Sequence, residues 1–282
     1  ASAVRDAERE KSKARLIAIH SLRGGTGCST LAVNLALATQ ALWEKHTILL
    51  DLAMTAGQVA LMLNAPLKRT WADLARFSAG NIDMDAIHSV INRHDSGLDF
   101  IPAPTLPSEA TPLKKETLAT TLQMLKEEYS YIITDLSHTF NSMTLTALGI
   151  ADRILLVVAP EMASIRAAAA ALDTYTKLGY PDEKIILVLN AVVPRSGLTQ
   201  EKIERALELP IKLTIPHSAD KFVQAINYGH PYLLKHPEDK ITGLFEELAF
   251  RLSRDEEKKT KPDDPSESLR RVYQRLRARQ KK

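Results

Sequence analysis

The sequence contains one cysteine, Cys28, so no disulfide bond can form within the chain. A chain without disulfides is typical of a reducing compartment, and we therefore expect a cytoplasmic location. Long hydrophobic runs are also missing, since segments such as 154–160 are far shorter than the ~20 apolar residues of a membrane-spanning helix. Residues 1–14 are charged throughout and lack the apolar centre of a secretory signal peptide.

No strong excess of charge is present either. The 282 residues include 37 Lys and Arg against 34 Asp and Glu, which gives a net charge of +3. Because this balance creates no general attraction to nucleic acid, nucleic acid is not an expected partner. The eight histidines are scattered, and no His, Cys and Asp cluster has the spacing of a protein zinc site.

Short apolar segments alternate with longer amphipathic ones along most of the chain. Such strands, separated by helices, are typical of a parallel sheet that is buried on both faces. We therefore predict an α/β fold with three layers, α/β/α, in which helices cover both faces of a mainly parallel, twisted sheet. The predicted strands are 15–22, 47–52, 98–102, 131–136, 153–160, 184–190 and 211–215. The predicted helices are 28–43, 71–77, 82–92, 114–129, 142–150, 163–178, 200–207, 218–227 and 241–252.

Composition divides the chain into three segments. Residues 15–254 have the length and apolar content of one domain with a single core. Residues 1–14 are expected to be an N-terminal extension, or the tail of an upstream domain, since the sequence does not start with methionine. Residues 255–282 are expected to be a charged linker followed by a basic C-terminal helix or tail. The part 255–268 is charged, contains two prolines and lacks apolar periodicity, which predicts flexibility.

The last residues are basic and weakly amphipathic. Residues 270–282 include seven basic side chains and no acidic one. On a helix that Ser266 or Ser268 caps, one narrow face would carry Leu269, Val272, Tyr273 and Leu276. Three interpretations remain open for this segment: a weak contact with an anionic membrane, a helix that docks on a partner, and a solvated tail.

A glycine-rich segment, RGGTGCST at 23–30, links the first predicted strand directly to a helix. Glycines let successive backbone N–H groups point inward, and the N-terminus of a helix adds partial positive charge. This context predicts a phosphate-binding loop in which the hydroxyl of Ser29 coordinates Mg²⁺. The alternative is a glycine-rich turn without a ligand. The predicted nucleotide-binding residues of the loop are Gly24, Gly25, Thr26, Gly27, Cys28, Ser29 and Thr30.

Cys28 stands at the position where a P-loop usually has lysine. A thiol has no fixed positive charge, so the loop keeps its backbone donors but loses the ammonium group that neutralises the β- and γ-phosphates. Because phosphoryl transfer depends mostly on positioning and electrostatics, we expect catalysis to suffer more than binding. Arg23 is a candidate replacement cation, in its own site or across a dimer, and the alternative is a solvated arginine at the end of a strand.

These residues resemble the Lys-Gly-Gly-x-Gly-Lys-Thr-Thr loop of the MinD/ParA family of deviant Walker A ATPases. Arg23 takes the position of the signature lysine, and Cys28 that of the P-loop lysine. A small residue in place of the second lysine is similar to the CpaE/TadZ branch, which serves Tad (Flp) pilus assembly. Other segments match in the same order, and together they span roughly residues 16–252: LLDLA at 49–53, GQVAL at 57–61, HDSGLDFIPA at 94–103, YIITD at 131–135, GYP at 179–181, IILVLN at 185–190, IP at 215–216 and AINYGHP at 225–231.

The resemblance, which implies a P-loop NTPase-like fold, assigns roles to two acidic residues. Asp135 ends a strand where the family has its Walker B carboxylate, which holds a Mg²⁺-bound water near Ser29; a helix cap is the alternative. Asp51 resembles the first aspartate of the Asp-x-Asp switch segment and is therefore a candidate catalytic residue. The second aspartate falls on Ala53, which has no acceptor to orient an attacking water.

Two further residues are assigned to the base of the nucleotide. Asn190 matches the asparagine with which the family reads adenine, because an amide both donates to and accepts from a purine edge. A turn-forming asparagine is the alternative. Pro216 lies on the loop that would flank the base.

The resemblance implies an ATP- and Mg²⁺-dependent homodimer that closes as a sandwich and presents a surface to the Tad pilus secretion machinery. It also implies a polar or membrane-peripheral position and a receiver-like domain upstream of residue 1. Since Cys28 and Ala53 both depart from the family pattern, we expect slow ATP hydrolysis at best. The alternatives are an active ParA/MinD-type partitioning or positioning ATPase and a pseudo-ATPase that binds no nucleotide.

Overall fold

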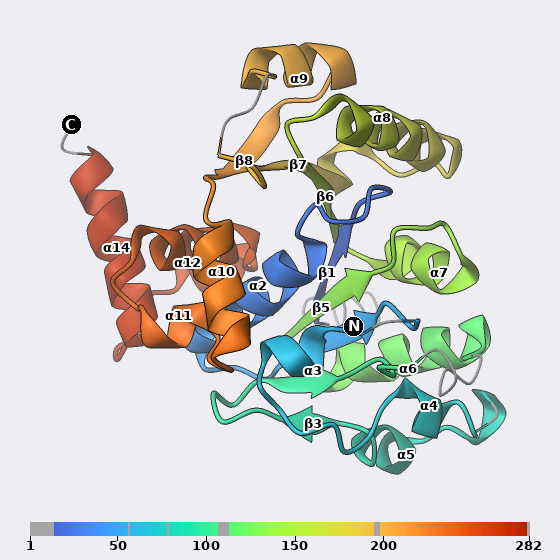
Figure 1. Ribbon diagram of the computed structural model, residues 1–282. Coiled ribbons are helices and arrows are strands. Elements are labelled where there is room, and N and C mark those ends of the chain that lie inside the picture. Colours follow the sequence, from blue (N-terminus) through green and yellow to red (C-terminus); the bar gives the residue numbers. More distant parts are fainter. Residues whose placement is uncertain (1–13, 56, 78, 107–112, 195–197, 281–282) are drawn as a thin grey trace, which may run out of the picture.

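The computed structural model describes residues 14–55, 57–77, 79–106, 113–194 and 198–280, which form a sheet with helices on both faces (Figure 1). The strands are β1 (Arg15–His20), β2 (Thr47–Leu52), β3 (Asn92–Arg93), β4 (Asp99–Ile101), β5 (Tyr131–Leu136), β6 (Arg153–Val158), β7 (Ile185–Asn190) and β8 (Ile211–Ile215). The helices are α2 (Cys28–Trp43), α3 (Val59–Met62), α4 (Trp71–Leu74), α5 (Met84–His88), α6 (Lys115–Glu128), α7 (Ser142–Ile150), α8 (Met162–Lys177), α9 (Gln200–Leu207), α10 (Ala219–Asn227), α11 (Tyr232–Lys235), α12 (Lys240–Leu252), α13 (Asp255–Lys259) and α14 (Glu267–Gln280), with 3₁₀ turns η1 (Ala79–Asn81) and η3 (Asp182–Lys184).

The described residues contribute eight strands to one sheet, in the order β3-β4-β2-β5-β1-β6-β7-β8. All neighbouring strands run parallel except β3, which pairs antiparallel with β4. The predicted α/β fold with a mainly parallel sheet is thus confirmed. Strand β1 lies between β5 and β6 in the middle of the sheet, so the segment that follows β1 leaves from the centre of the domain.

Each face of the sheet has its own hydrophobic core. Along β1, Leu16 and Ala18 point into one core, while Ile17 and Ile19 point into the other. Helices α6, α7 and α8 cover the first face, and α2, α12 and α14 cover the second. Burial on both faces explains why these strands are continuous apolar runs rather than alternating ones.

Several short elements differ from the sequence prediction. The helix expected over 82–92 is the five-residue α5, and β3 begins where that helix was expected to end. Helices α3 and α11 were not predicted, because four residues are too few to show a helical period. These elements lie in the connections around the sheet and leave its strand order unchanged.

The segment predicted to be a flexible linker begins with a helix that contacts the domain, which differs from that expectation. Helix α13 occupies its first part, and the side chain of Glu257 is only 9% exposed. Glu257 accepts hydrogen bonds from Lys45 Nζ at 2.7 Å and from Arg254 Nη2 at 2.9 Å, and it also contacts the Tyr131 hydroxyl. Charged residues of this segment form ion pairs with the domain. The charged composition of the segment alone does not reveal such pairs, because it is equally typical of a solvated linker.

Helix α14 packs on α2 and α12 (Figure 1). At its start, Ser266 Oγ accepts a hydrogen bond from Leu269 N–H at 3.2 Å and donates one to the Leu42 carbonyl at 2.7 Å. Of the two serines considered as its cap, Ser266 makes this contact. Three arginines of α14 pair with two carboxylates of α12 at 2.5 to 3.0 Å: Arg271 and Arg275 with Glu246, and Arg275 and Arg279 with Glu247.

This packing turns part of the apolar face of the C-terminal helix toward the domain, which bears on the open interpretation of a membrane contact. Leu269 and Val272 are 1% and 0% exposed, because they belong to the core between α2 and α12. As folded, the helix therefore does not present them to a lipid surface. Within the described part of the chain, we find no helix whose length and apolar content suffice to cross a membrane.

We expect the packing of α14 to contribute measurably to the stability of the domain. Substitution of Val272 by Ala removes two methyl groups from a fully buried site and should lower the free energy of unfolding by about 1–3 kcal/mol. The exposed neighbour Gln274 is the matched control, and its change to Ala should stay within about 0.5 kcal/mol. Urea unfolding monitored by circular dichroism measures both; equal stabilities would show that α14 is not part of the cooperative unit.

Candidate functional site

The predicted phosphate loop lies at the carboxyl end of β1 and leads into α2. Gly25 and Gly27 have φ angles of 80° and 90°, in the left-handed region that favours glycine. Within the described structure, no atom lies within 4 Å of the position that a Cβ would take on Gly24 or Gly25, so this side of the loop is open. Helix α2 begins at Cys28 without a side-chain cap from a described residue, which leaves its first N–H groups to face the open side. These features together are those of a candidate anion site.

A cleft of about 430 Å³ lies above this loop. Its walls come from the segments that follow β1, β2 and β5, which end at the same edge of the sheet. Sequence reasoning found the loop but missed Thr55, Ser137 and His138, which also line the cleft. They directly follow the ends of predicted strands, and this position was the available signal.

Two buried carboxylates lie side by side under the cleft. Asp51 of β2 and Asp135 of β5 are register partners on neighbouring parallel strands, and both are almost fully buried. Asp51 accepts hydrogen bonds from the backbone N–H groups of Ala53 at 3.1 Å and Val59 at 3.2 Å. Its carboxylate therefore holds the segment between β2 and α3, and its predicted catalytic role stays a prediction.

Asp135 has no such partners. Neither of its carboxylate oxygens forms a hydrogen bond with any residue in the described ranges. Burial, and then the negative charge of Asp51, raise the pKa of Asp135, while the nearby Ser29 hydroxyl opposes this shift only in part. A buried oxygen pair without donors, next to a hydroxyl and an anion site, fits a hard divalent cation. Ser29 and Asp135 are the residues that would hold Mg²⁺ here.

The side chain at the usual lysine position is neutral. The Cys28 Sγ lies 3.5 Å from Thr26 Oγ1. Burial, and then the charge of Asp135, raise the pKa of the Cys28 thiol to about 12, so it is not a thiolate at neutral pH. The loop thus offers backbone donors and a hydroxyl, but its central side chain brings no charge.

Arg23 is bound at the rim of the cleft. Its Nε donates to Glu161 Oε1 at 3.2 Å, and both side chains are about half exposed, at 48% and 47%. An ion pair this exposed contributes at most about 1 kcal/mol, so it can open at little cost. Ala53 also lines the cleft, so a methyl group occupies the position where the sequence resemblance expects a second aspartate.

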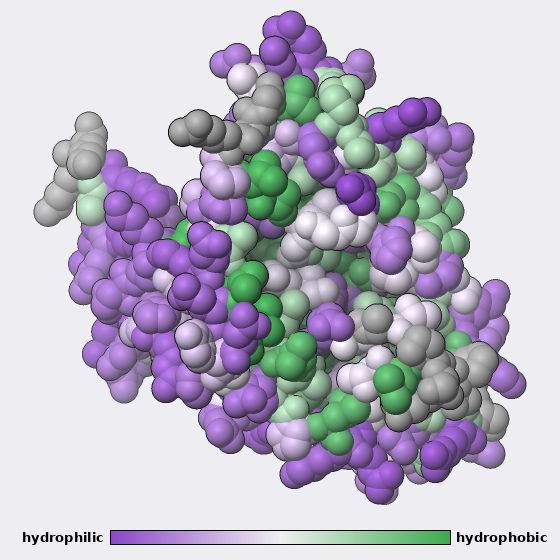
Figure 2. All heavy atoms as spheres, in the orientation of Figure 1, coloured by the Kyte–Doolittle hydropathy of each residue, from purple (hydrophilic) through white to green (hydrophobic). Residues whose placement is uncertain are grey.

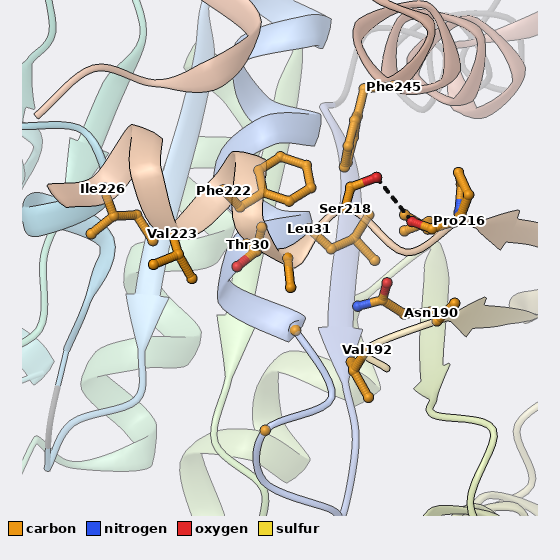
Figure 3. Close-up of a pocket in the computed structure, with 15 residues that line it drawn as sticks. Thr30, Leu31, Asn190, Val192, Pro216, Ser218, Phe222, Val223, Ile226 and Phe245 are labelled. Carbon is orange, nitrogen blue, oxygen red and sulfur yellow. Dashed lines mark hydrogen bonds between the residues drawn. The ribbon is translucent and has the colours of Figure 1, made fainter. Parts of the chain in front are cut away.

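A second cavity, of about 250 Å³, adjoins the loop on the side of β7 and β8 (Figure 3). Asn190 and Pro216 line it, and Gly25, Gly27 and Thr30 form its border with the phosphate loop. The structure therefore brings both residues assigned to the base next to those assigned to the phosphates. Asn190 Nδ2 donates to the Thr26 carbonyl at 2.8 Å, so it is bonded to the loop itself.

Helix α10 completes this cavity with apolar side chains. Phe222, Val223 and Ile226 point into it from one face of the helix (Figure 3). None of the residues of α10 is fully buried in the structure as described, although its apolar face is pronounced. The sequence predicted the helix but not its place at the cavity; the spacing of Phe222 and Ile226, four residues apart, was the signal for an apolar face.

Comparisons with known proteins agree with this arrangement. Residues 14–200 match the family model described as cellulose biosynthesis protein BcsQ. The chain is 27% identical over 243 residues to the septum site-determining protein MinD of Thermotoga maritima, covering 84% of this chain and 87% of that protein. It is 29% identical over 238 residues to an uncharacterised ATP-binding protein of Methanocaldococcus jannaschii, covering 84% and 86%.

Solved structures are similar in fold. A ParA family ATPase from Chlorobium tepidum superposes with a TM-score of 0.76 at 23% identity, covering 83% of this chain and 98% of that one. The septum site-determining protein MinD from Pyrococcus horikoshii, complexed with Mg-ADP, gives a TM-score of 0.75 at 21% identity, covering 88% and 100%.

Substitution of Asp135 should raise the stability of the nucleotide-free protein but weaken nucleotide binding. Asp135→Asn should stabilise the nucleotide-free protein by about 1–3 kcal/mol at neutral pH, because it removes a carboxyl that burial beside Asp51 destabilises as an anion and forces to take up a proton. The same change should weaken Mg²⁺-dependent nucleotide binding, since an amide is a poorer cation ligand. Thermal unfolding with and without Mg²⁺–ATP measures both effects, and an unchanged titration would remove Asp135 from the site.

The stability gain should also depend on pH. Since the pKa of Asp135 is raised in the folded protein, the native state binds more protons than the unfolded one above the ordinary carboxyl pKa of about 4. The stability of the wild type should therefore fall, relative to Asp135→Asn, as the pH rises toward neutrality. The opposite trend, expected from the buried His20 whose pKa burial lowers to about 4, is the same in both proteins and cancels in the difference.

Proposed function

This chain belongs to the MinD/ParA-type family of P-loop ATPases, through its match to the BcsQ family model, and on that premise we propose that it is an ATP-binding localisation and assembly factor. It binds Mg²⁺–ATP, dimerises in response, and hydrolyses the nucleotide slowly or not at all. The observation that carries this proposal is the combination of an open phosphate loop and an unpaired Asp135 with a neutral thiol at Cys28.

Binding follows from groups that remain in place. The backbone N–H groups at the start of α2 and the glycines of the loop face the open cleft. Ser29 and Asp135 supply oxygen ligands for Mg²⁺, and the bound cation offsets the cost of burying two adjacent carboxylates. The adjoining apolar cavity accommodates a purine between Pro216 and the apolar face of α10.

Slow hydrolysis follows from the groups that are replaced. No ammonium group neutralises the phosphates from position 28, and Ala53 has no side-chain acceptor to orient a water. Removing one preorganised electrostatic contact commonly costs about 3–4 kcal/mol in the transition state. Two such changes leave a site suited to holding a nucleotide for long periods.

Exposed hydrophobic side chains support dimerisation through the face that carries the site. In Figure 2 the hydrophobic residues of the visible face gather around its hollowed centre. Met162, Leu61 and Val223 are 69%, 58% and 53% exposed. Val223 lines the second cavity. Leu61 precedes Met62, which lines the cleft, and Met162 follows Glu161, which pairs with Arg23. A second copy that covers this face would bury them and bring its own Arg23 near the phosphates.

Two cellular systems are candidates for the assembly that this protein serves: the Tad pilus and cellulose biosynthesis. The small residue at position 28 resembles the CpaE/TadZ branch, which favours Tad (Flp) pilus assembly and a polar, membrane-peripheral position. The match of residues 14–200 to the cellulose biosynthesis protein BcsQ family favours cellulose biosynthesis instead. We propose the first, and co-purification of the chain with Tad secretion proteins, rather than with cellulose biosynthesis proteins, tests it.

An active partitioning or positioning ATPase is the second candidate function. The similarity to MinD over 84% of the chain favours it. It requires partner-stimulated turnover and, for a DNA partner, affinity that falls steeply with the logarithm of salt concentration. Phosphate release below one turnover per hour with every tested partner would reject it.

Calorimetric titration with Mg²⁺–ATP should show saturable binding, and light scattering should show a dimer only when nucleotide is present. Met162→Asp should block the dimer without weakening ATP binding, because Met162 is exposed at the start of α8, next to Glu161, which pairs with Arg23, and it does not line the cleft. Leu178 is the matched control: it is also exposed, but it follows the far end of α8, about 24 Å away along the helix. No heat of binding at millimolar ATP would overturn the proposed function.

Restoring charge at the loop should raise hydrolysis only modestly. Cys28→Lys should increase phosphate release by less than about tenfold, because the water-orienting carboxylate is still missing at position 53. Cys28→Lys combined with Ala53→Asp should exceed the product of the two single effects, since both groups act on the same transition state. If Cys28→Lys alone reached the rate of an active family member, the assignment of Ala53 would be wrong.

A further inference from the structure

The side-chain amide of Asn190 connects the base cavity to the phosphate loop. Its Nδ2 donates to the Thr26 carbonyl at 2.8 Å, although the two residues are 164 positions apart in the sequence. A carbonyl oxygen only accepts, so the end of the amide that faces Thr26 must be the NH₂ group. The carbonyl oxygen of Asn190 is then the end left for the cavity (Figure 3).

The loop is shaped to fit this side chain. Gly27 has a φ of 90°, and a Cβ at this position would stand 2.4 Å from Asn190 Nδ2. Glycine is therefore required at residue 27 both by its backbone conformation and by the approach of Asn190. Because Gly27 is the last residue before α2, the position of Asn190 also fixes where that helix begins.

Asn190 is itself held by the sheet. It is the last residue of β7 and pairs with Ile215 of β8. The next residue, Ala191, donates its N–H to the Ile215 carbonyl at 2.9 Å, and its own carbonyl contacts His217 Nδ1 at 3.1 Å. The hydrogen bond to Thr26 therefore anchors the loop to a rigid strand end.

Besides the half-exposed pair of Arg23 with Glu161 at the rim and the Ser29 hydroxyl near Asp135, the side-chain hydrogen bonds of the described loop residues are local. Thr26 Oγ1 donates to the Arg23 carbonyl at 3.2 Å, and Arg23 N–H donates to Ser21 Oγ at 3.2 Å. These bonds span two or three residues, so they shape the turn but do not place it relative to the rest of the domain. The bond from Asn190 does place it.

We propose that Asn190 is a positioning residue for the phosphates, in addition to its place at the base. Its Nδ2–H holds Thr26 and Gly27 so that the N–H groups of the loop converge on one anion. The resulting gain in affinity does not require the ligand to carry a base. This inference rests on the proposed function, since it concerns how the same loop grips a polyphosphate.

The test compares Asn190→Asp at pH 8 with Asn190→Leu. Both variants keep the approximate size of the side chain and remove the donor. Amide hydrogen exchange of the peptide that covers residues 24–30, in the nucleotide-free protein, should become about three- to tenfold faster, the range expected for one lost hydrogen bond. Peptides from β1 and β5 serve as internal references for global unfolding and should be unchanged.

The second measurement is the affinity for Mg²⁺–tripolyphosphate, which has no base. The affinity should fall about three- to tenfold in Asn190→Leu and further in Asn190→Asp, whose carboxylate also repels the anion. Val192→Ala is the matched control: Val192 lines the base cavity two residues further on, so this change should weaken ATP binding but leave tripolyphosphate binding and loop exchange as in the wild type.

Unchanged loop exchange in both donor-free variants would overturn the positioning role, even if ATP binding were lost. Weaker ATP binding with intact tripolyphosphate binding would likewise confine Asn190 to the base. A wild-type chain that binds neither ligand would instead reject the proposed function, and the exchange rates would still decide the role of Asn190.

Discussion

Two parallel strands end side by side and place the carboxylates of Asp51 and Asp135 together in a buried position. The backbone N–H groups of Ala53 and Val59 stabilise the first, whereas the second has only the Ser29 hydroxyl near it among the described residues. Such a pair is costly unless a cation or a proton relieves it. The cleft, the open glycine loop and Ser29 all lie where a Mg²⁺–phosphate group would provide that relief. The arrangement links folding of this edge of the sheet to occupancy of the site.

In the proposed function, this site separates nucleotide binding from hydrolysis. Its backbone donors and oxygen ligands are intact, while the thiol of Cys28 and the methyl group of Ala53 replace the groups that would speed the reaction. The apolar cavity and the exposed hydrophobic residues around it lie on the same side of the sheet. If the proposed dimer forms, one ligand can therefore affect both this cavity and the surface that would meet a second copy.

The sequence was sufficient for most of the fold, because strands buried on both faces are continuous apolar runs that no surface helix imitates. It also located the glycine loop, Asp135 and Asn190, since each lies at a strand end. The sequence was not sufficient where contacts between residues distant in the chain determine the local structure. The charged residues after 254 were expected to be solvated, yet Glu257 pairs with Lys45 and Arg254. Likewise, the bond from Asn190 to Thr26 joins residues whose proximity no local pattern encodes.

The pairing of α14 with α12 affects how the C-terminus can be studied. Glu246 is buried, and Glu247 nearly so, and the arginines of α14 are their counter-charges. A chain shortened before α14 would keep both carboxylates but lose their partners, and it would uncover the back of α2, the helix that starts at the phosphate loop. A truncation made to ask where the protein travels in the cell would thus also disturb the helix that begins at the glycine loop. Single-residue changes on the outer surface of α14 avoid this ambiguity.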